Sequence, residues 1–229
     1  MISRLSGLLS DPLSFLLTLP CILLALSGHE FAHGWMAWKL GDPTARNLGR
    51  LTLNPLKHLD PVGTLCMVFF GFGWARPVPV NARYFKNNRR DFALTALAGP
   101  AANFIMAFLG LFLLHLLFFL STAFPPSSEF GARLWMAGLR MAQSFVILNI
   151  SLGVFNLIPC PPLDGSRIFL VWLPPKYYFG VMQYERYIQL GLMLLLWLGL
   201  LSKPLMCGVN GLYSLMDWVI TRIPFFRIG

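Results

Sequence analysis

Long hydrophobic runs, separated by short polar and basic stretches, dominate this chain. Six such runs cover about residues 13–40, 62–74, 92–120, 134–159, 187–202 and 205–220. The first, third and fourth are long enough to cross a lipid bilayer as helices. Lys203-Pro204 divides the last two, which can form two spans or a hairpin of tilted helices. The pattern predicts an all-α polytopic membrane protein with about five to six hydrophobic segments.

Two parts of the pattern do not indicate spanning helices. The 62–74 run is short for a span and has basic residues on both sides, so we expect it to re-enter the membrane or lie in the interface. The 75–81 segment, Ala-Arg-Pro-Val-Pro-Val-Asn, is rich in proline and β-branched residues. Such a composition predicts an extended edge strand or a hairpin.

The composition agrees with a membrane protein. Charged residues make up 12% of the chain, whereas about a quarter of the residues in a soluble domain are charged. The formal net charge is +9, but the basic residues lie in short loops between hydrophobic runs. There they set the topology and contact lipid headgroups. Because the sequence contains no soluble basic domain of the kind that binds nucleic acid, we expect a lipid bilayer as partner and no nucleic acid.

The distribution of basic residues predicts the orientation. Nine of the eighteen Lys and Arg residues lie between Lys39 and Arg90. The positive-inside rule places this region in the cytoplasm and the Ser121–Gly131 loop outside. We therefore expect a multi-pass protein of the cell membrane, the inner membrane in a bacterium.

The segment His29-Glu30-Phe31-Ala32-His33 is an HExxH motif within the first hydrophobic run. Two histidines four residues apart lie on one face of a helix and can bind one zinc ion. The glutamate beside the first histidine can take a proton from a zinc-activated water. In the alternative interpretation, the histidines only form hydrogen bonds across a helix bundle. That alternative gives no reason for placing such costly polar groups in lipid.

A catalytic zinc needs a third protein ligand. Apart from Glu30, only Asp164 and Asp217 among the acidic residues lie in apolar surroundings. Asp164 follows Pro159-Cys160-Pro161-Pro162, which cannot continue a regular helix, so a bend can bring its carboxylate to the first span. Its predicted depth also matches that of the histidines. Asp217 lies near a span end, where we expect it to reach the interface.

Two further features concern polar and small residues within the spans. Asn156 lies eight residues before Asp164. Its amide can donate a hydrogen bond to a developing oxyanion, or it can form an interhelical hydrogen bond, and spacing alone leaves both open. The small residues of Gly99-Pro100-Ala101-Ala102-Asn103 permit a close contact between helices.

These motifs together resemble the site-2 protease family of intramembrane zinc metalloproteases. The resemblance extends through HEFAH (29–33), GDPTARNLGRLTLNPLKHLDPVGT (41–64), GWARPVPVN (73–81), AGPAANF (98–104) and FNLIPCPPLDGSRI (155–168). It implies that His29, His33 and Asp164 bind one Zn²⁺ per chain. It also implies that Glu30 acts as general base and acid, and that Asn156 contacts the substrate or the oxyanion.

The resemblance also implies a fold and a function. It implies a single transmembrane metalloprotease domain over residues 1–229, of the compact subgroup that lacks PDZ and CBS domains. A small membrane-associated β-hairpin around 76–81 is implied, to which an unwound substrate could add as a strand. The implied reaction is hydrolysis of peptide bonds within or near transmembrane segments of membrane proteins. The alternative is a zinc-binding membrane protein without protease activity, such as a transporter or a pseudoprotease.

Overall fold

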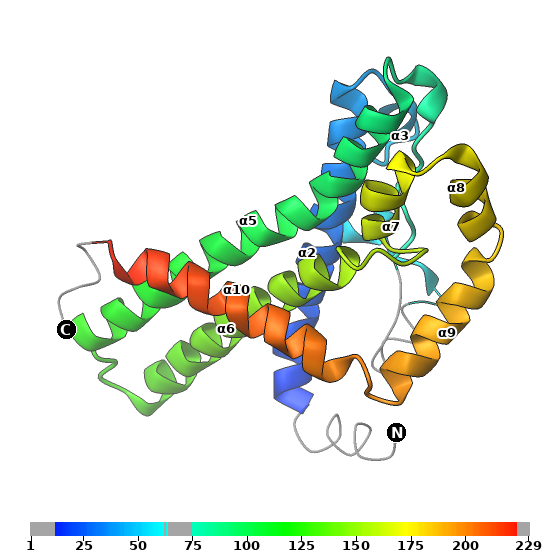
Figure 1. Ribbon diagram of the computed structural model, residues 1–229. Coiled ribbons are helices and arrows are strands. Elements are labelled where there is room, and N and C mark those ends of the chain that lie inside the picture. The colour runs from blue at the N-terminus through cyan, green and yellow to red at the C-terminus, as the bar shows by residue number, and fades with distance from the viewer. Residues whose placement is uncertain (1–11, 62, 64–74, 224–229) are drawn as a thin grey trace.

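The computed structural model describes residues 12–61, 63 and 75–223, and the protein is mostly helical (Figure 1). Its elements, in chain order, are α2 (Pro12–Lys39), α3 (Thr44–Asn47), η1 (Pro55–Lys57), η2 (Ala82–Tyr84), α5 (Asn88–Ala123), α6 (Glu129–Asn156), α7 (Asp164–Phe169), η3 (Leu170–Trp172), α8 (Pro175–Met182), α9 (Glu185–Trp197) and α10 (Ser202–Thr221).

Three helices are long and apolar enough to cross a membrane, and they are α2 from Leu16 onward, α5 and α6. A fourth candidate span is the pair α9 and α10, which is bent by 81° at a short break. The sequence pattern therefore predicted the three long spans. The expected five to six segments reduce to three or four candidate spans in the described ranges. The predicted re-entrant run at 62–74 lies almost entirely outside those ranges.

Two spans begin before their hydrophobic runs because capping side chains extend them. The Asn87 side chain accepts from the backbone N–H of Arg90, and a carboxylate oxygen of Asp91 accepts from the Asn87 N–H. This reciprocal pair satisfies N–H groups that have no partner in the first turn of a helix. At α6, the Ser128 hydroxyl caps the helix by accepting from the backbone N–H of Gly131.

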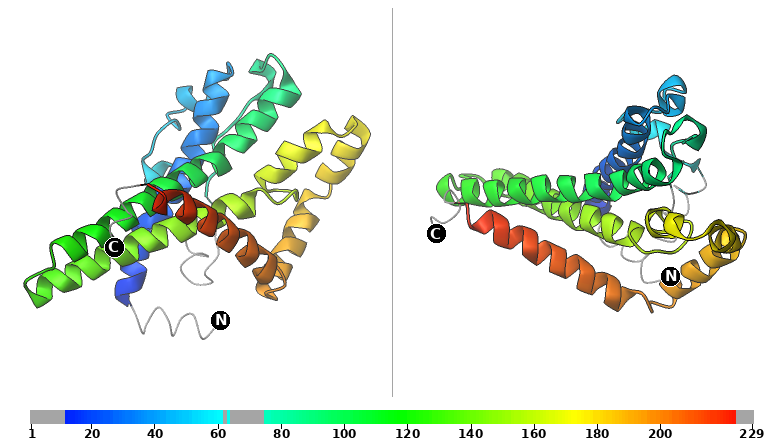
Figure 2. Two further views of the ribbon diagram at one scale, coloured as in Figure 1. Left: turned by 60° about the vertical axis from the view of Figure 1, so that its left-hand side comes forward. Right: turned by 45° about the horizontal axis from the view of Figure 1, so that its top comes forward.

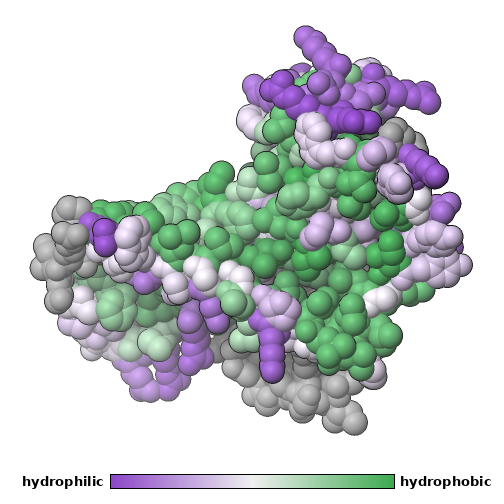
Figure 3. All heavy atoms as spheres, viewed as in Figure 1, coloured by the Kyte–Doolittle hydropathy of each residue, from purple (hydrophilic) through white to green (hydrophobic). Residues whose placement is uncertain are grey.

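The core lies between α5, α6 and α10. Figures 1 and 2 show α5 and α6 side by side as an antiparallel pair, with α10 packed across α6 and α2 crossing both. The buried apolar cluster is formed by Ala107, Leu111, Val146, Ile150, Val209 and Ile220. Many large apolar side chains on these helices face outward, and the hydrophobic surface in Figure 3 is broad. A surface of this kind suits contact with lipid.

Hydrophilic residues collect at one end of the molecule, over α3 and the start of α5 (Figure 3). The exposed basic residues there are Arg46, Arg83, Lys86, Arg89 and Arg90. The C-terminal end of α2, which follows the HExxH motif, reaches the same end of the molecule (Figure 1).

The predicted β-hairpin is not seen in the described part of the chain. The single β pairing there is an isolated antiparallel bridge between Leu59 and Ala75. Residues 76–81, called the 76–81 segment below, form neither a helix nor a paired strand. Most of the 62–74 stretch that would precede such a strand lies outside the described residues, so the hairpin stays a prediction.

Candidate metal centre

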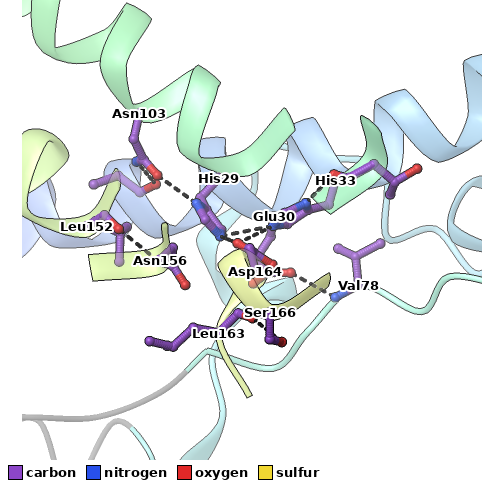
Figure 4. Close-up of polar contacts among 12 residues, drawn as sticks. His29, Glu30, His33, Val78, Asn103, Leu152, Asn156, Leu163, Asp164 and Ser166 are labelled. Carbon is purple, nitrogen blue, oxygen red and sulfur yellow. Dashed lines mark hydrogen bonds and ion pairs between the residues drawn. The ribbon is translucent and has the colours of Figure 1, made fainter. Parts of the chain in front are cut away.

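Two side chains of α2, His29 and His33, meet the distant Asp164 at the start of α7 (Figure 4). The Nε2 atoms of His29 and His33 lie 3.0 Å apart. Oδ2 of Asp164 lies 3.1 Å from Nε2 of His29 and 3.2 Å from Nε2 of His33. Within the described ranges this is the one group of three or more His, Cys, Asp or Glu side chains that could hold a metal ion.

Helix α5 presents a row of three residues to the two histidines. The carbonyl oxygen of Thr95 lies 2.7 Å from Nδ1 of His33, and Oδ1 of Asn103 lies 2.6 Å from Nδ1 of His29. Gly99 lies between them in the row. Thr95, Gly99 and Asn103 are each four residues from the next, which is also the spacing of His29 and His33. Successive turns of the antiparallel helices α2 and α5 therefore face one another.

Gly99 makes this contact possible because it has no side chain. A Cβ at this position would overlap the His33 imidazole and lie 2.6 Å from Cε1 of His29. Real Cβ atoms essentially never approach other atoms this closely. The predicted close helix contact at residues 99–103 therefore includes the candidate site itself.

A tight loop after α6 delivers Asp164. The helix ends at Asn156, before the proline-rich stretch, and α7 begins at Asp164. Gly165 packs against the carbonyl groups of Leu157 and Ile158, where a Cβ would overlap both backbones. The chain therefore doubles back on the end of α6, and this fold-back brings the carboxylate to α2.

The donor set fits a metal ion. Since a backbone carbonyl can only accept, Nδ1 of His33 carries the proton that it donates to Thr95, and in the neutral ring Nε2 bears a lone pair. His29 has the same arrangement when it donates to Asn103. Oδ2 of Asp164 is buried and has no hydrogen-bond donor among the described residues. Three acceptor atoms thus face one another at about 3 Å, and two imidazoles with a carboxylate are a common zinc ligand set.

Glu30 lies beside this group without belonging to it. It is buried, and its Oε2 accepts a 2.8 Å hydrogen bond from the backbone N–H of Val78. Oε1 of Glu30 has no hydrogen-bond partner within the described ranges. One carboxylate oxygen is thus oriented by the 76–81 segment, and the other remains available to a proton.

The 76–81 segment is held at both ends. The N–H of Arg76 donates to the His58 carbonyl at 2.7 Å, and Nη2 of Arg50 donates to the Arg76 carbonyl at 2.7 Å. At the other end, the N–H of Asn81 donates to Oδ2 of the fully buried Asp42 at 2.7 Å. Burial and the neighbouring Arg76 cation lower the pKa of Arg50 from its ordinary value. Residues 42–58 therefore form a support that fixes the segment against Glu30.

The hydrogen bonds of the 76–81 segment limit how a substrate strand could add to it. Pro77 and Pro79 have no N–H, and the N–H groups of Arg76, Val78 and Asn81 donate to the protein itself. A strand that pairs here would depend mainly on the carbonyl oxygens of the segment.

Asn156 is the last residue of α6 and lies near Asp164 in Figure 4. Its Nδ2 donates a 2.9 Å hydrogen bond to the carbonyl oxygen of Leu152, within its own helix. Within the described ranges the amide forms no hydrogen bond to another helix. Its second N–H is not used by this bond, and a substrate or oxyanion contact stays a prediction.

The rival acidic residue lies elsewhere. Oδ1 of Asp217 lies 3.1 Å from Nε2 of His115, and Nδ1 of His115 lies 3.0 Å from the Leu111 carbonyl oxygen. This contact joins α10 to α5 and takes no part in the group of His29, His33 and Asp164.

Sequence reasoning assigned no role at the site to Thr95 or Asn103. Their spacing from Gly99, equal to the spacing of the histidines, was the available signal. It becomes informative only once α2 and α5 are known to be antiparallel neighbours.

Comparisons with known proteins agree with a metalloprotease. The sequence profile "Peptidase family M50" matches residues 127–198, which include Asn156 and Asp164. YwhC of Bacillus subtilis, named as a candidate zinc metalloprotease, is 45% identical over 170 residues, which are 72% of this chain and 73% of that protein.

The Rip2 proteins of Mycolicibacterium smegmatis and Mycobacterium tuberculosis, named in the same way, are 33% and 32% identical over 71% of this chain. The matched region spans 59% of each of these two longer relatives. No solved structure matches the chain significantly.

Proposed function

The chain belongs to peptidase family M50, the site-2 proteases, and is a zinc metalloprotease; we propose that it cleaves its substrates within the membrane. The reaction is hydrolysis of peptide bonds within or beside transmembrane segments of other membrane proteins. The observation that carries this proposal is the convergence of three acceptor atoms beside a buried glutamate on a membrane-type helix.

His29, His33 and Asp164 hold the zinc in this proposal. Their Nε2 and Oδ2 atoms face one another, and both imidazoles are oriented by hydrogen bonds from Nδ1 to α5. When bound, zinc supplies Lewis-acid activation of the scissile carbonyl and of the attacking water.

Glu30 moves the proton. Its Oε1 accepts the proton of the attacking water and returns it to the leaving amine. The hydrogen bond from Val78 to Oε2 keeps the carboxylate in one orientation during both transfers. Because Glu30 is not one of the three proposed zinc ligands, its carboxylate is free to act as the base.

The substrate must be unwound locally, because the carbonyl groups of a helix already accept hydrogen bonds. The carbonyl oxygens of the 76–81 segment can pair with the N–H groups of such an unwound stretch, beside Glu30. Asn156 would donate to the scissile carbonyl oxygen through the N–H that Leu152 does not accept.

The site lies in the cytoplasmic half of the cell membrane in this proposal. The histidines are in the second half of α2, and the basic end of the molecule follows them. The whole chain, residues 1–229, acts as one transmembrane protease domain whose partners are lipid and a transmembrane substrate.

The proposal is tested with the full chain purified in detergent and a fluorogenic model transmembrane peptide. We expect cleavage by the wild-type protein, its loss after chelation and its return with zinc. Glu30→Gln should retain about one zinc per chain and lose cleavage by at least about a hundredfold, as expected on removal of a general base. Glu129→Gln, at an exposed position of α6, is the matched control and should cleave normally.

Two results would contradict the proposal. Cleavage at the wild-type rate by Glu30→Gln would remove Glu30 from its role. Zinc binding without cleavage of any membrane-embedded peptide would favour the alternative of a zinc-binding membrane protein without protease activity.

A further inference from the structure

Two asparagines are buried in the centre of the helix bundle. Asn103 on α5 and Asn149 on α6 are both 0% exposed. An amide at membrane depth is costly unless all its polar atoms are paired. The proposed peptidase mechanism uses Asn103 only as the hydrogen-bond partner of His29 and gives Asn149 no role, so the contact between the two asparagines needs its own explanation.

The hydrogen bonds of the pair have a fixed direction. Nδ2 of Asn149 donates to the carbonyl oxygen of Phe145 at 2.8 Å, so Oδ1 of Asn149 points to Asn103. Nδ2 of Asn103 donates to that oxygen at 2.9 Å and to the carbonyl oxygen of Ala25 at 3.3 Å. Backbone carbonyls can only accept, so Phe145 and Ala25 fix the orientation of both amides.

The opposite orientation is excluded by the same carbonyls. Turning both amides would place the amide oxygen of Asn103 against the Ala25 carbonyl. It would also place the amide oxygen of Asn149 against the Phe145 carbonyl. Each contact would set two buried acceptors together without a proton, which is strongly unfavourable.

The end of this chain of hydrogen bonds is His29. Oδ1 of Asn103 lies 2.6 Å from Nδ1 of His29 and can only accept. The neutral His29 imidazole must therefore carry its proton on Nδ1 and its lone pair on Nε2, the atom that faces His33 and Asp164. His33 is fixed differently, by the backbone carbonyl of Thr95.

We propose that Asn103 and Asn149 are positioning residues that set the tautomer and ring orientation of His29 for zinc binding. This inference rests on the proposed function of the site. Asn103 acts directly on His29, and Asn149 acts through Asn103. The network also joins α2, α5 and α6, so the geometry of one ligand depends on the packing of three helices.

The test separates this role from a purely structural one. Asn103→Leu removes the acceptor for His29 at similar size. Asn103→Asp keeps an acceptor for His29 but places its second oxygen against the Ala25 carbonyl and Asn149. The zinc affinity of the full chain in detergent is measured by competition with a chromogenic chelator. The unfolding temperature of the zinc-free protein is measured in parallel.

We expect Asn103→Leu to weaken zinc binding by about 10- to 100-fold, the usual effect of losing a hydrogen bond to a ligating histidine. Asn103→Asp should lower the unfolding temperature yet bind zinc within about threefold of wild type, since a carboxylate serves this role in many zinc sites. A purely structural role predicts that zinc affinity follows stability in both variants.

Asn149→Leu is the second variant, and it decides the question if Asn103→Leu does not fold. It should weaken zinc binding less than Asn103→Leu, because Ala25 still orients Asn103. Gln143→Leu, which removes an exposed amide from the same helix, is the control and should bind zinc normally.

Wild-type zinc affinity in both Asn103→Leu and Asn149→Leu would overturn the inference, and so would equal losses in Asn103→Leu and Asn103→Asp. Neither result depends on cleavage. A wild-type protein that binds zinc and cleaves nothing would refute the proposed function alone.

Discussion

The backbone N–H of Val78 donates a 2.8 Å hydrogen bond to Oε2 of Glu30, although 48 positions separate the two residues in the chain. The donor belongs to the 76–81 segment, which Arg50 and Asp42 hold in place. The orientation of the proposed base therefore depends on a loop outside the membrane-type helices. Since the donor is a backbone group, only proline removes it.

We predict that Val78→Pro lowers the cleavage rate by about 10- to 100-fold, because a hydrogen bond to a charged group contributes about 1.5–3 kcal/mol. Zinc content should not change, since Val78 is not one of the three proposed ligands His29, His33 and Asp164. Val78→Ala keeps the N–H and is the control. The prediction is checked by rates of peptide cleavage and by metal analysis. Equal rates for the two variants would show that the hydrogen bond is dispensable.

Gly99→Ala should disrupt the zinc site although it adds one methyl group. The added Cβ would overlap the His33 imidazole, and overpacking of this kind costs about 1–3 kcal/mol. We expect the zinc affinity to fall at least about tenfold, because both rings must move. Gly138→Ala, on α6 with no atom within 4 Å of its Cβ, should leave zinc affinity unchanged. Chelator competition measures both, and a normal affinity in Gly99→Ala would mean that α2 and α5 can separate without cost.

Asp164→Asn should lower zinc occupancy, because an amide cannot replace the charge of the carboxylate ligand. Asp217→Asn is the matched control. It also removes a carboxylate that contacts a histidine, but Asp217 is not one of the proposed zinc ligands. We expect the control to keep its zinc and to unfold at a somewhat lower temperature. Metal analysis after dialysis distinguishes them. One zinc per chain in Asp164→Asn, with full activity, would point to another ligand.

The proposed orientation predicts which loops an impermeant thiol reagent can reach. In a background without the four native cysteines, Ser127→Cys lies in the loop between α5 and α6, and Leu48→Cys follows α3. Both positions are exposed. Ser127→Cys should be labelled in intact cells, and Leu48→Cys only after permeabilisation. The reverse pattern would invert the topology.

The HExxH motif could be interpreted from sequence because its geometry is local. Helical spacing alone places His29 and His33 on one face, whatever the rest of the chain does. The hydrophobic runs of α2, α5 and α6 were equally clear, since lipid demands about twenty apolar residues in a row. Asp164 could be singled out because so few carboxylates lie in apolar surroundings.

The residues that orient the site could not be predicted in the same way. Thr95, Asn103 and Asn149 act through contacts between helices, and these depend on which spans pack together and at what height. Sequence interpretation offered Asn156 a hydrogen bond to another helix or to an oxyanion. The structure shows a hydrogen bond within its own helix, and the oxyanion contact stays a prediction. Side-chain direction of this kind is set by neighbouring packing, which spacing along one helix does not contain.

The order in which the site residues occur along the chain bears on biosynthesis. Both histidines are synthesised early, whereas Asp164 follows 131 positions after His33. An emerging chain would therefore carry Glu30 and two of the three proposed zinc ligands through most of its translation. It would gain the third only after α6 has entered the membrane and the fold-back at Gly165 has formed. The three proposed zinc ligands are therefore brought together only by a late step of synthesis, after the chain beyond α6 has been made.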